Sequence, residues 1–143
     1  MSFRPPRTLP ILTLFHNVRV KNSQAALQLL QSKQKTESGD EKYRIDVVDE
    51  AHSQPTETQL KQMASFLDSP TPYKDLMFND AGTGESQVTN VHDALKYIDT
   101  AKEFAADKPI LRTPILVDWE RGKAAIGQPT LQSIEKLINE RIK

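Results

Sequence analysis

The fold of this chain is decided close to its C-terminus, by the stretch Arg112-Thr-Pro-Ile-Leu-Val-Asp-Trp-Glu-Arg-Gly-Lys-Ala-Ala-Ile-Gly127. Within it, Pro114 precedes two short apolar runs, Ile115 to Val117 and Ala124 to Ile126, which predict two strands. The turn Glu120-Arg121-Gly122 joins them, and so short a connection makes the strands antiparallel. The stretch therefore predicts a hairpin near the end of the molecule.

A terminal helix is predicted after this hairpin. Gly127-Gln-Pro129 ends the second strand, and Thr130 is placed to cap the helix that follows. The apolar residues of this helix recur at helical spacing and form one face, which comprises Leu131, Ile134, Leu137 and Ile138.

The N-terminal part predicts a strand, a helix and a second strand. Ile11 to Phe15 is a continuous apolar run, as expected of a central strand that is buried on both faces. Ser23 is placed to cap the following helix, whose inward positions are Ala25, Ala26, Leu27 and Leu30. A second strand is predicted from Tyr43, Ile45, Val47 and Val48. This order implies a right-handed crossover between two parallel strands.

The middle of the chain predicts two helices and a loop. Thr56 and Gln59 have the spacing of a capping box, and the inward face of their helix comprises Leu60, Met63, Ala64 and Leu67. Ser69 to Pro72 ends this helix, and residues 73–90 are interpreted as a mobile loop. A further helix is expected from about Asp93 to Ala106, with one face made of Val91, Leu95, Ile98, Lys102 and Phe104. The order βαβ, helical insertion, ββα predicts an α/β fold: a four-stranded mixed sheet with helices on both faces.

Composition and charge narrow the classes of function. The 143 residues suit one domain, which can bury about two-thirds of its unfolded surface. Lys plus Arg and Asp plus Glu each total 19, so the formal net charge is zero and no nucleic-acid partner is expected. The three histidines lack metal-ligand spacing, and the apolar runs are far shorter than the roughly 20 residues of a membrane-spanning helix. Neither a metal nor membrane insertion is predicted, and the oligomeric state stays open.

The N-terminus is basic. No acidic residue precedes Glu37, a bias that is typical of mitochondrial transit segments. We therefore separate a basic segment at 1–9, a candidate for a short targeting segment, from a single domain at 10–143. From composition alone, an ordinary basic N-terminus of a cytoplasmic protein is the alternative.

Residues at both ends of the chain resemble a known group of proteins. The run from Ile11 through His16-Asn-Val-Arg-Val-Lys-Asn-Ser23 to Leu27 resembles the first strand, active loop and first helix of the arsenate reductase branch of thioredoxin-like proteins. The end of the chain, from Leu111 to Ile138, is similar to that branch's final strand pair and helix. The chain further resembles a fungal family of small thioredoxin-like proteins described as mitochondrial redox proteins, for which Val117-Asp-Trp119 followed by Gly122 is typical. The resemblance implies a thioredoxin-like fold, an oxidoreductase and a mitochondrial location.

The resemblance also implies where a catalytic thiol belongs. In the arsenate reductase pattern a nucleophilic cysteine lies at the N-terminus of the first helix, where the helix dipole lowers its pKa, and this position is Val20 here. Members of the fungal family carry a second candidate cysteine near the position of Glu103. Because the chain has no cysteine, it has no side chain that can form a disulfide, and direct thiol catalysis is not expected.

The remaining candidates each have a structural and a functional interpretation. For Ser23 a helix cap is favoured over a nucleophile, and for His16 a loop residue bonded to backbone is favoured over an acid or base. The resemblance implies that the Thr113-Pro114 bond is cis and faces the active loop. Arg112 lies one residue earlier than the oxyanion-binding arginine of arsenate reductases, which turns it toward the opposite face and favours a surface ion pair over anion binding.

Trp119 is expected to anchor the C-terminal helix rather than to bind a ligand.

Two functions of different classes follow. The first is a redox-family protein that uses an external thiol such as glutathione, bound near His16, Asn17, Val20 and Pro114. The second is a non-catalytic binding module whose cis-proline groove holds an extended peptide or protein partner by strand-like pairing. Both use the same groove, which is predicted from His16, Asn17, Val20, Ser23, Arg112, Thr113 and Pro114.

Overall fold

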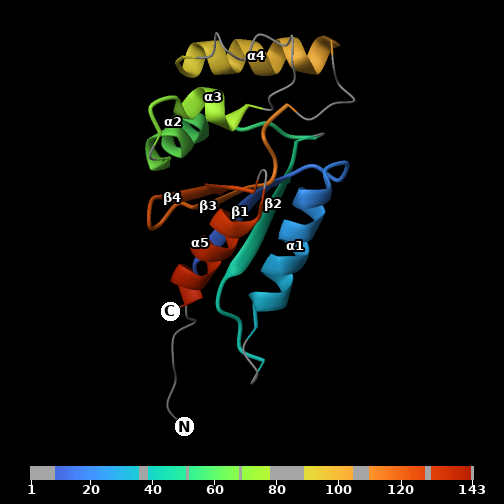
Figure 1. Ribbon diagram of the computed structural model, residues 1–143, viewed down its shortest axis with the longest axis vertical. Coiled ribbons are helices and arrows are strands. Elements are labelled where there is room, and N and C mark those ends of the chain that lie inside the picture. Colours follow the sequence, from blue (N-terminus) through green and yellow to red (C-terminus); the bar gives the residue numbers. More distant parts are fainter. Residues whose placement is uncertain are drawn as a thin grey trace.

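A four-stranded mixed sheet forms the centre of the molecule (Figure 1). The computed structural model describes residues 9–35, 39–50, 52–67, 69–77, 89–104, 110–127 and 130–142. The strands are β1 (Ile11–His16), β2 (Arg44–Asp49), β3 (Ile115–Asp118) and β4 (Lys123–Ile126), in the order β2-β1-β3-β4. β1 runs parallel to β2 and antiparallel to β3, and β3 runs antiparallel to β4. The predicted fold class, with its central first strand and its final hairpin, is confirmed.

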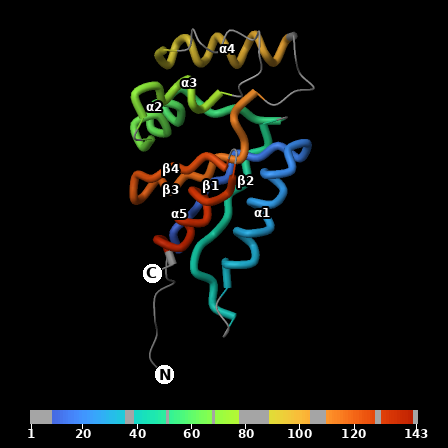
Figure 2. The backbone as a smooth tube through the Cα atoms, viewed as in Figure 1, coloured from blue at the N-terminus to red at the C-terminus, as the bar shows by residue number. Residues whose placement is uncertain are grey.

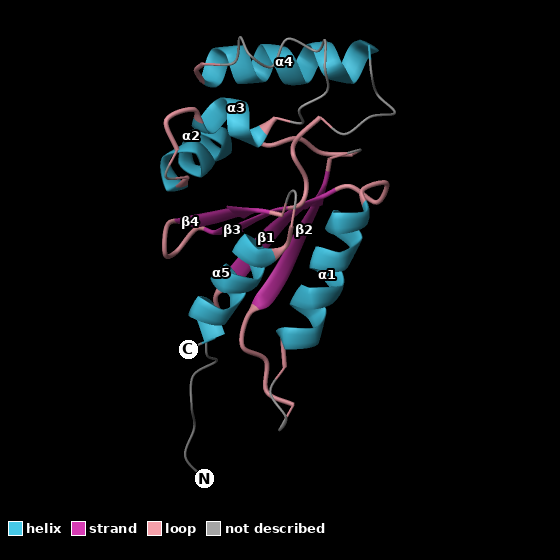
Figure 3. Ribbon diagram, in the orientation of Figure 1, coloured by secondary structure: helices cyan, strands magenta, loops and turns pink. Residues whose placement is uncertain are grey.

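Helices cover both faces of the sheet (Figures 1 and 3). α1 (Lys21–Lys33) and α5 (Gln132–Ile142) lie on one face, and their core includes Leu12, Leu14 and Leu116. α2 (Glu57–Phe66), α3 (Pro72–Leu76) and α4 (Val91–Phe104) lie on the other face, above Phe15, Ile115 and Val117. Because successive side chains of a strand point to opposite faces, the apolar runs of β1 and β3 supply both cores. α4 packs on α2 and α3 and forms the outermost layer.

The edge strand β2 is less buried than its apolar sequence predicts. Val47 is 41% exposed and Ile45 is half-buried, whereas their neighbours in β1, Leu14 and Leu12, are fully buried. An edge strand has a partner on one side only, so its side chains receive less cover.

The first helix begins earlier than predicted. α1 starts at Lys21 with Val20 as its N-cap, and no side chain caps it. Ser23 is therefore the third residue of the helix and is fully buried, so the prediction that it caps α1 is wrong. The buried stripe comprises Ser23, Ala26 and Leu30. Ala25, which was expected to point inward, is exposed because it lies to one side of this stripe.

The start of α2 agrees with the prediction, whereas the start of the loop predicted after it does not. The Thr56 hydroxyl accepts the Gln59 N–H at 3.1 Å, and the Gln59 side chain accepts the Thr56 N–H at 3.0 Å, which confirms the capping box. The prediction of a loop from residue 73 is wrong, because α3 begins at Pro72. α2 already ends at Phe66, and Pro72 is the first residue of α3, a position to which proline is well suited. The part of the predicted loop at 78–88 lies outside the described residues.

The boundaries of the last two helices also differ from the prediction. α4 begins at Val91, and Lys102, which was predicted on its inward face, is exposed, whereas Ala94 is buried. The predicted end at Ala106 lies outside the described residues. α5 begins at Gln132, two residues after Thr130, so the predicted cap is displaced from the helix start.

Trp119 anchors the sheet to α2 rather than to the C-terminal helix. Its ring meets that of Phe66 edge to face, with centroids 6.1 Å apart, and its indole N–H donates to the Thr13 hydroxyl at 2.8 Å. The face of the sheet that carries Trp119 is opposite to the one that α5 covers. The prediction of an anchor is correct and its predicted partner is wrong.

Candidate functional site

The candidate site lies where β1 and β2 end and α1 begins, next to the segment that leads into β3 (Figure 2). Buried polar side chains gather there, namely His16, Asn17, Ser23, Glu50 and Thr113. A buried polar group is costly unless it has a hydrogen-bond partner, so such a cluster must be internally bonded or functional.

His16 and Ser23 form a buried pair. His16 Nδ1 lies 2.5 Å from Ser23 Oγ, and the main-chain N–H of Asn17 donates to the same oxygen at 2.9 Å. The serine hydroxyl therefore joins the end of β1 to the first turn of α1. Ser23 is fully buried and His16 is 5% exposed, so the pair is inaccessible to a substrate. Its role is structural, since it holds the end of β1 against the first turn of α1.

Asn17 shapes the loop that carries the nucleophile in the arsenate reductase pattern. Its side-chain oxygen accepts the Arg19 N–H at 2.9 Å, and its carbonyl oxygen accepts the Val20 N–H at 3.0 Å. The Gln24 side chain donates to the carbonyl of Val18. These bonds hold residues 17–20 in a tight turn of the kind that asparagine favours.

Glu50 connects this loop to the segment before β3. One carboxylate oxygen accepts the Asn17 side-chain amide at 2.6 Å and the Ile110 N–H at 3.1 Å, and the other accepts the Leu111 N–H at 3.2 Å. Burial raises the pKa of Glu50, and its neighbour Asp49 adds to this, while the three hydrogen bonds oppose it. Sequence reasoning missed Glu50, although an acidic residue directly after a strand parallel to the central strand is a usable signal.

The Thr113-Pro114 peptide bond is cis, as predicted. The Thr113 N–H donates to the Leu111 carbonyl at 2.7 Å, and the Pro114 carbonyl accepts the Gly127 N–H at 2.8 Å. Gly127 fits tightly, because a Cβ atom there would lie 2.5 Å from Pro114 Cγ. The Asn22 side chain donates to the Gly127 carbonyl at 2.8 Å. Pro114 is thus held next to the start of α1.

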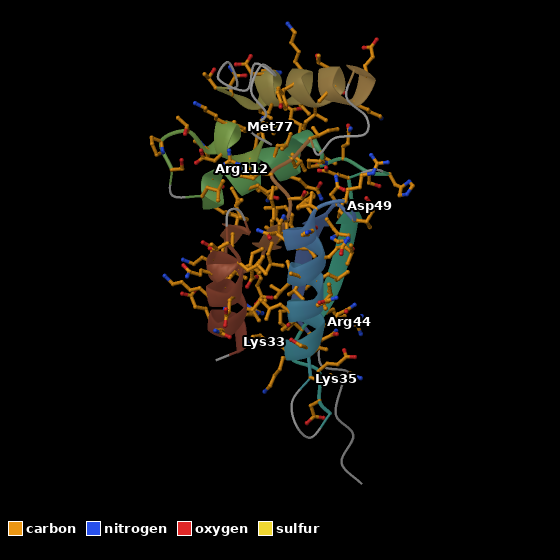
Figure 4. The ribbon with its side chains drawn as sticks, turned by 45° about the vertical axis from the view of Figure 1, so that its right-hand side comes forward. Lys33, Lys35, Arg44, Asp49, Met77 and Arg112 are labelled. Atoms are coloured by element: carbon orange, nitrogen blue, oxygen red, sulfur yellow. The ribbon has the colours of Figure 1, made fainter. Side chains whose placement is uncertain are left out.

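Arg112 lies on the α3 side of this segment. Its main-chain N–H donates to the Leu76 carbonyl at 2.8 Å, and the neighbouring Leu111 forms a β-bridge with Met77. Figure 4 shows Met77 and Arg112 together beside α3. Both alternatives for the Arg112 side chain, anion binding and a surface ion pair, remain predictions.

The structure brings most of the predicted groove together. His16, Asn17, Val20, Ser23 and Pro114 all belong to the hydrogen-bonded end of the sheet described above. Val20 is half-buried at the N-cap of α1, the location that the resemblance implies for a nucleophile. Glu103, by contrast, is exposed near the end of α4, in the outer layer.

Two absences hold for the described part of the chain. Its side chains form no group of three or more acidic or histidine residues that could hold a metal ion. None of its helices is both long and apolar enough to cross a membrane.

Comparison with known proteins places the fold and the family. The structure is similar to arsenate reductase from Vibrio cholerae, with a TM-score of 0.60 and 20% sequence identity, over 90% of this chain and 98% of that chain. At this identity the likeness shows the fold alone, and it confirms the predicted thioredoxin-like class. No curated protein matches the chain. A family model described as "Protein of unknown function (DUF1687)" matches residues 3–127, and because this is most of its length, the chain belongs to that family.

Proposed function

We propose that this protein is a thioredoxin-fold binding module that does no thiol chemistry of its own. The observation that carries the proposal combines two features. Val20 occupies the position that the resemblance implies for a nucleophile, and beside it Asn17 donates its main-chain N–H to Ser23 and its side-chain amide to Glu50. Nothing in this network is presented as a nucleophile. What the network does is fix the shape of the loop and of the cis-proline segment, which is what a binding surface needs.

The proposed contact surface is the outside of this fixed loop. Val18 is 54% exposed, more than any other large apolar side chain of the described residues, and Arg19 and Lys21, which follow it in the sequence, are also exposed. An apolar residue flanked by cations suits a partner segment with an apolar anchor and acidic neighbours. Strand-like pairing at the cis-proline is the weaker mode, because the Thr113 N–H already donates to Leu111.

Site-specific photo-crosslinking tests this proposal. A photoreactive amino acid at position 18 is expected to capture a partner in cells, and the same probe at Val47, an exposed valine on the edge strand, serves as the matched control. Val18→Asp should abolish co-purification of the captured partner, whereas Val47→Asp should leave it unchanged. Equal capture from both positions contradicts the proposed surface.

A second candidate is a redox protein that borrows an external thiol. The similarity of its fold to an arsenate reductase and the sequence resemblance to fungal mitochondrial redox proteins favour it. Glutathione is the proposed thiol, and it binds between the loop at 16–20 and Pro114. Titration of glutathione and of oxidised glutathione into labelled protein checks this: amide shifts confined to residues 16–23 and 112–115 support the second candidate, and unchanged shifts there count against it.

The mitochondrial location and the fungal origin belong to this same proposal and rest on the sequence resemblance. Fusion of a fluorescent protein to the C-terminus, with and without residues 1–9, tests the location. Import that is lost with these residues supports a targeting segment, and uniform cytoplasmic signal from both forms contradicts it.

A further inference from the structure

Two hydroxyl residues between α2 and α3 are each followed by proline, in the run Ser69-Pro-Thr-Pro72. Protein kinases of the proline-directed class act on such pairs, since proline lacks an N–H and keeps the residue before it out of the helical conformation. Thr71 is exposed and is the N-cap residue of α3. In the described part of the chain the other Thr-Pro pair is Thr113-Pro114, and Thr113 is 1% exposed. Accessibility therefore singles out the run at 69–72.

Both hydroxyls donate to one carboxylate. Ser69 Oγ donates to one oxygen of Asp75, and Thr71 Oγ1 donates to the other at 3.2 Å. The Asp75 N–H donates back to the Thr71 carbonyl at 3.0 Å, and the Thr71 N–H donates to Ser69 Oγ at 3.1 Å. Asp75 thus clamps the linker onto α3, a helix of five residues that is too short to be stable on its own.

This clamp is connected to the candidate site through the end of α3. Leu76 is fully buried, and its carbonyl accepts the Arg112 N–H at 2.8 Å. Met77 forms a β-bridge with Leu111, whose N–H also donates to Glu50. A change in the position of α3 therefore acts on the segment that leads to Pro114.

We propose that Thr71 is a phosphorylation site for a proline-directed protein kinase, and that the phosphate loosens α3 from residues 110–113. In the transfer step Thr71 Oγ1 bonds to the γ-phosphorus of ATP, the bond from that phosphorus to the β,γ-bridging oxygen breaks, and ADP leaves. The hydroxyl proton passes to a base of the kinase. The product has lost the hydrogen bond to Asp75 and carries a charge of about −1.5 to −2 next to that carboxylate.

Repulsion by Asp75 outweighs the attraction of the helix end. A phosphate at a helix N-terminus is ordinarily favourable, but this attraction comes from partial charges at the helix end, and α3 has only five residues. The carboxylate of Asp75 is a full charge at hydrogen-bond distance from the modified oxygen. This inference goes beyond the proposed binding function and does not depend on it, because phosphorylation and amide hydrogen exchange are measured on this chain without a binding partner.

The modification is tested on the full chain with ATP and a purified proline-directed kinase, followed by mass spectrometry. Incorporation of one phosphoryl group at Thr71 is expected. It should be lost in Pro72→Ala, which removes the proline after Thr71, and kept in Pro70→Ala, which removes the proline after Ser69. No incorporation at Thr71, or incorporation that Pro72→Ala leaves unchanged, overturns the assignment of the site.

The structural effect is tested by amide hydrogen exchange at Arg112. Phosphorylated protein should exchange this amide roughly tenfold faster, the ratio expected when such a charge lies about 4 Å from a carboxylate in water. The acceleration should vanish in Asp75→Asn, which keeps the shape and removes the charge. Thr71→Glu compared with Thr71→Gln gives the same test without a kinase, with faster exchange in the Glu variant. An Arg112 amide that is unaffected or slowed in both comparisons overturns the coupling.

Discussion

The starts of α1 and α2 are built in opposite ways. α2 begins with a capping box in which Thr56 and Gln59, both near the surface, satisfy each other's N–H groups. α1 begins at Val20 with no side-chain cap and is held instead by distant partners, since Asn22 bonds to Gly127 and Ser23 lies against His16. The first arrangement stabilises one helix. The second fixes the relative positions of three segments, which is the requirement of a site.

The largest loss of stability is expected at Glu50, which accepts hydrogen bonds from three distant residues. Glu50→Ala removes the acceptor of three hydrogen bonds and leaves the Ile110 and Leu111 N–H groups buried without their partner. We expect the free energy of unfolding to fall by about 3 kcal/mol. Urea denaturation followed by tryptophan fluorescence measures it.

Glu57→Ala is the matched control, because Glu57 is an exposed acid in the first turn of α2 whose nearest cation, Lys61, is 3.5 Å away. It should change the free energy of unfolding by about 0.5 kcal/mol or less. Equal losses in the two variants would mean that the Glu50 network contributes no more than a surface ion pair.

The next largest loss of stability is expected at the contact between Pro114 and Gly127, which follows β4. In Gly127→Ala the new methyl group would lie 2.5 Å from Pro114 Cγ and 2.7 Å from Ile134 Cδ1, so one of these groups must move. We expect a loss of about 2 kcal/mol, and amide shifts that spread to Asn22 through its bond to the Gly127 carbonyl. Shifts confined to residues next to position 127 would show that the start of α1 is independent of this contact.

The two helix starts are compared directly by Ser23→Ala and Thr56→Ala. Thr56→Ala removes one cap and should cost about 1 kcal/mol. Ser23→Ala leaves the Asn17 N–H and His16 without their buried partner and should cost about 2 kcal/mol. Double mutants with Glu50→Ala sharpen the contrast: we expect the Ser23 loss to be coupled to Glu50 through Asn17, and the Thr56 loss to be additive. Additivity in both would contradict a shared network.

The sequence predicts elements that depend on local rules and misses those that depend on tertiary contacts. Three features depend only on residues that are close together in the sequence, and the structure has all of them: the capping box of Thr56, the hairpin at Gly122 and the apolar runs of β1 and β3. Ser23 fits the pattern of a cap equally well, but its hydroxyl bonds to the end of β1 instead. Glu50 is 33 residues from Asn17 and 60 from Ile110, so no local pattern shows their bonds. The candidate site is thus the part that sequence periodicity describes least.

The substitution Val20→Cys tests whether this position lowers the pKa of a thiol, as the resemblance to arsenate reductases implies. In Val20→Cys the sulfur lies at the N-terminus of α1, whose dipole favours the thiolate, so its pKa should fall by about one unit from the ordinary value of about 8.5. Glu103→Cys, near the C-terminal end of α4, experiences the opposite end of a dipole and should show no decrease. The pH dependence of alkylation measures both pKa values. A decrease at position 103 but not at 20 would reverse the assignment of the nucleophile position.

The smallest effect is the contribution of Glu50 to the pH dependence of stability. Burial raises its pKa in the folded protein above the ordinary value of 4.5, so the folded state retains the proton to higher pH than the unfolded chain does. Its stabilising contribution is therefore complete below about pH 4.5 and is lost as the pH rises through the raised pKa. The quantity to follow is the difference in unfolding free energy between the wild type and Glu50→Gln, which cannot titrate at this position, because the contributions of the rest of the chain are common to both proteins. We expect this difference to move in favour of Glu50→Gln as the pH rises from about 4.5 toward neutrality, by less than the loss caused by Glu50→Ala. A difference that moves in favour of the wild type would mean that the hydrogen bonds from Asn17, Ile110 and Leu111 outweigh burial, and that Glu50 holds the two segments together as a fully ionised carboxylate.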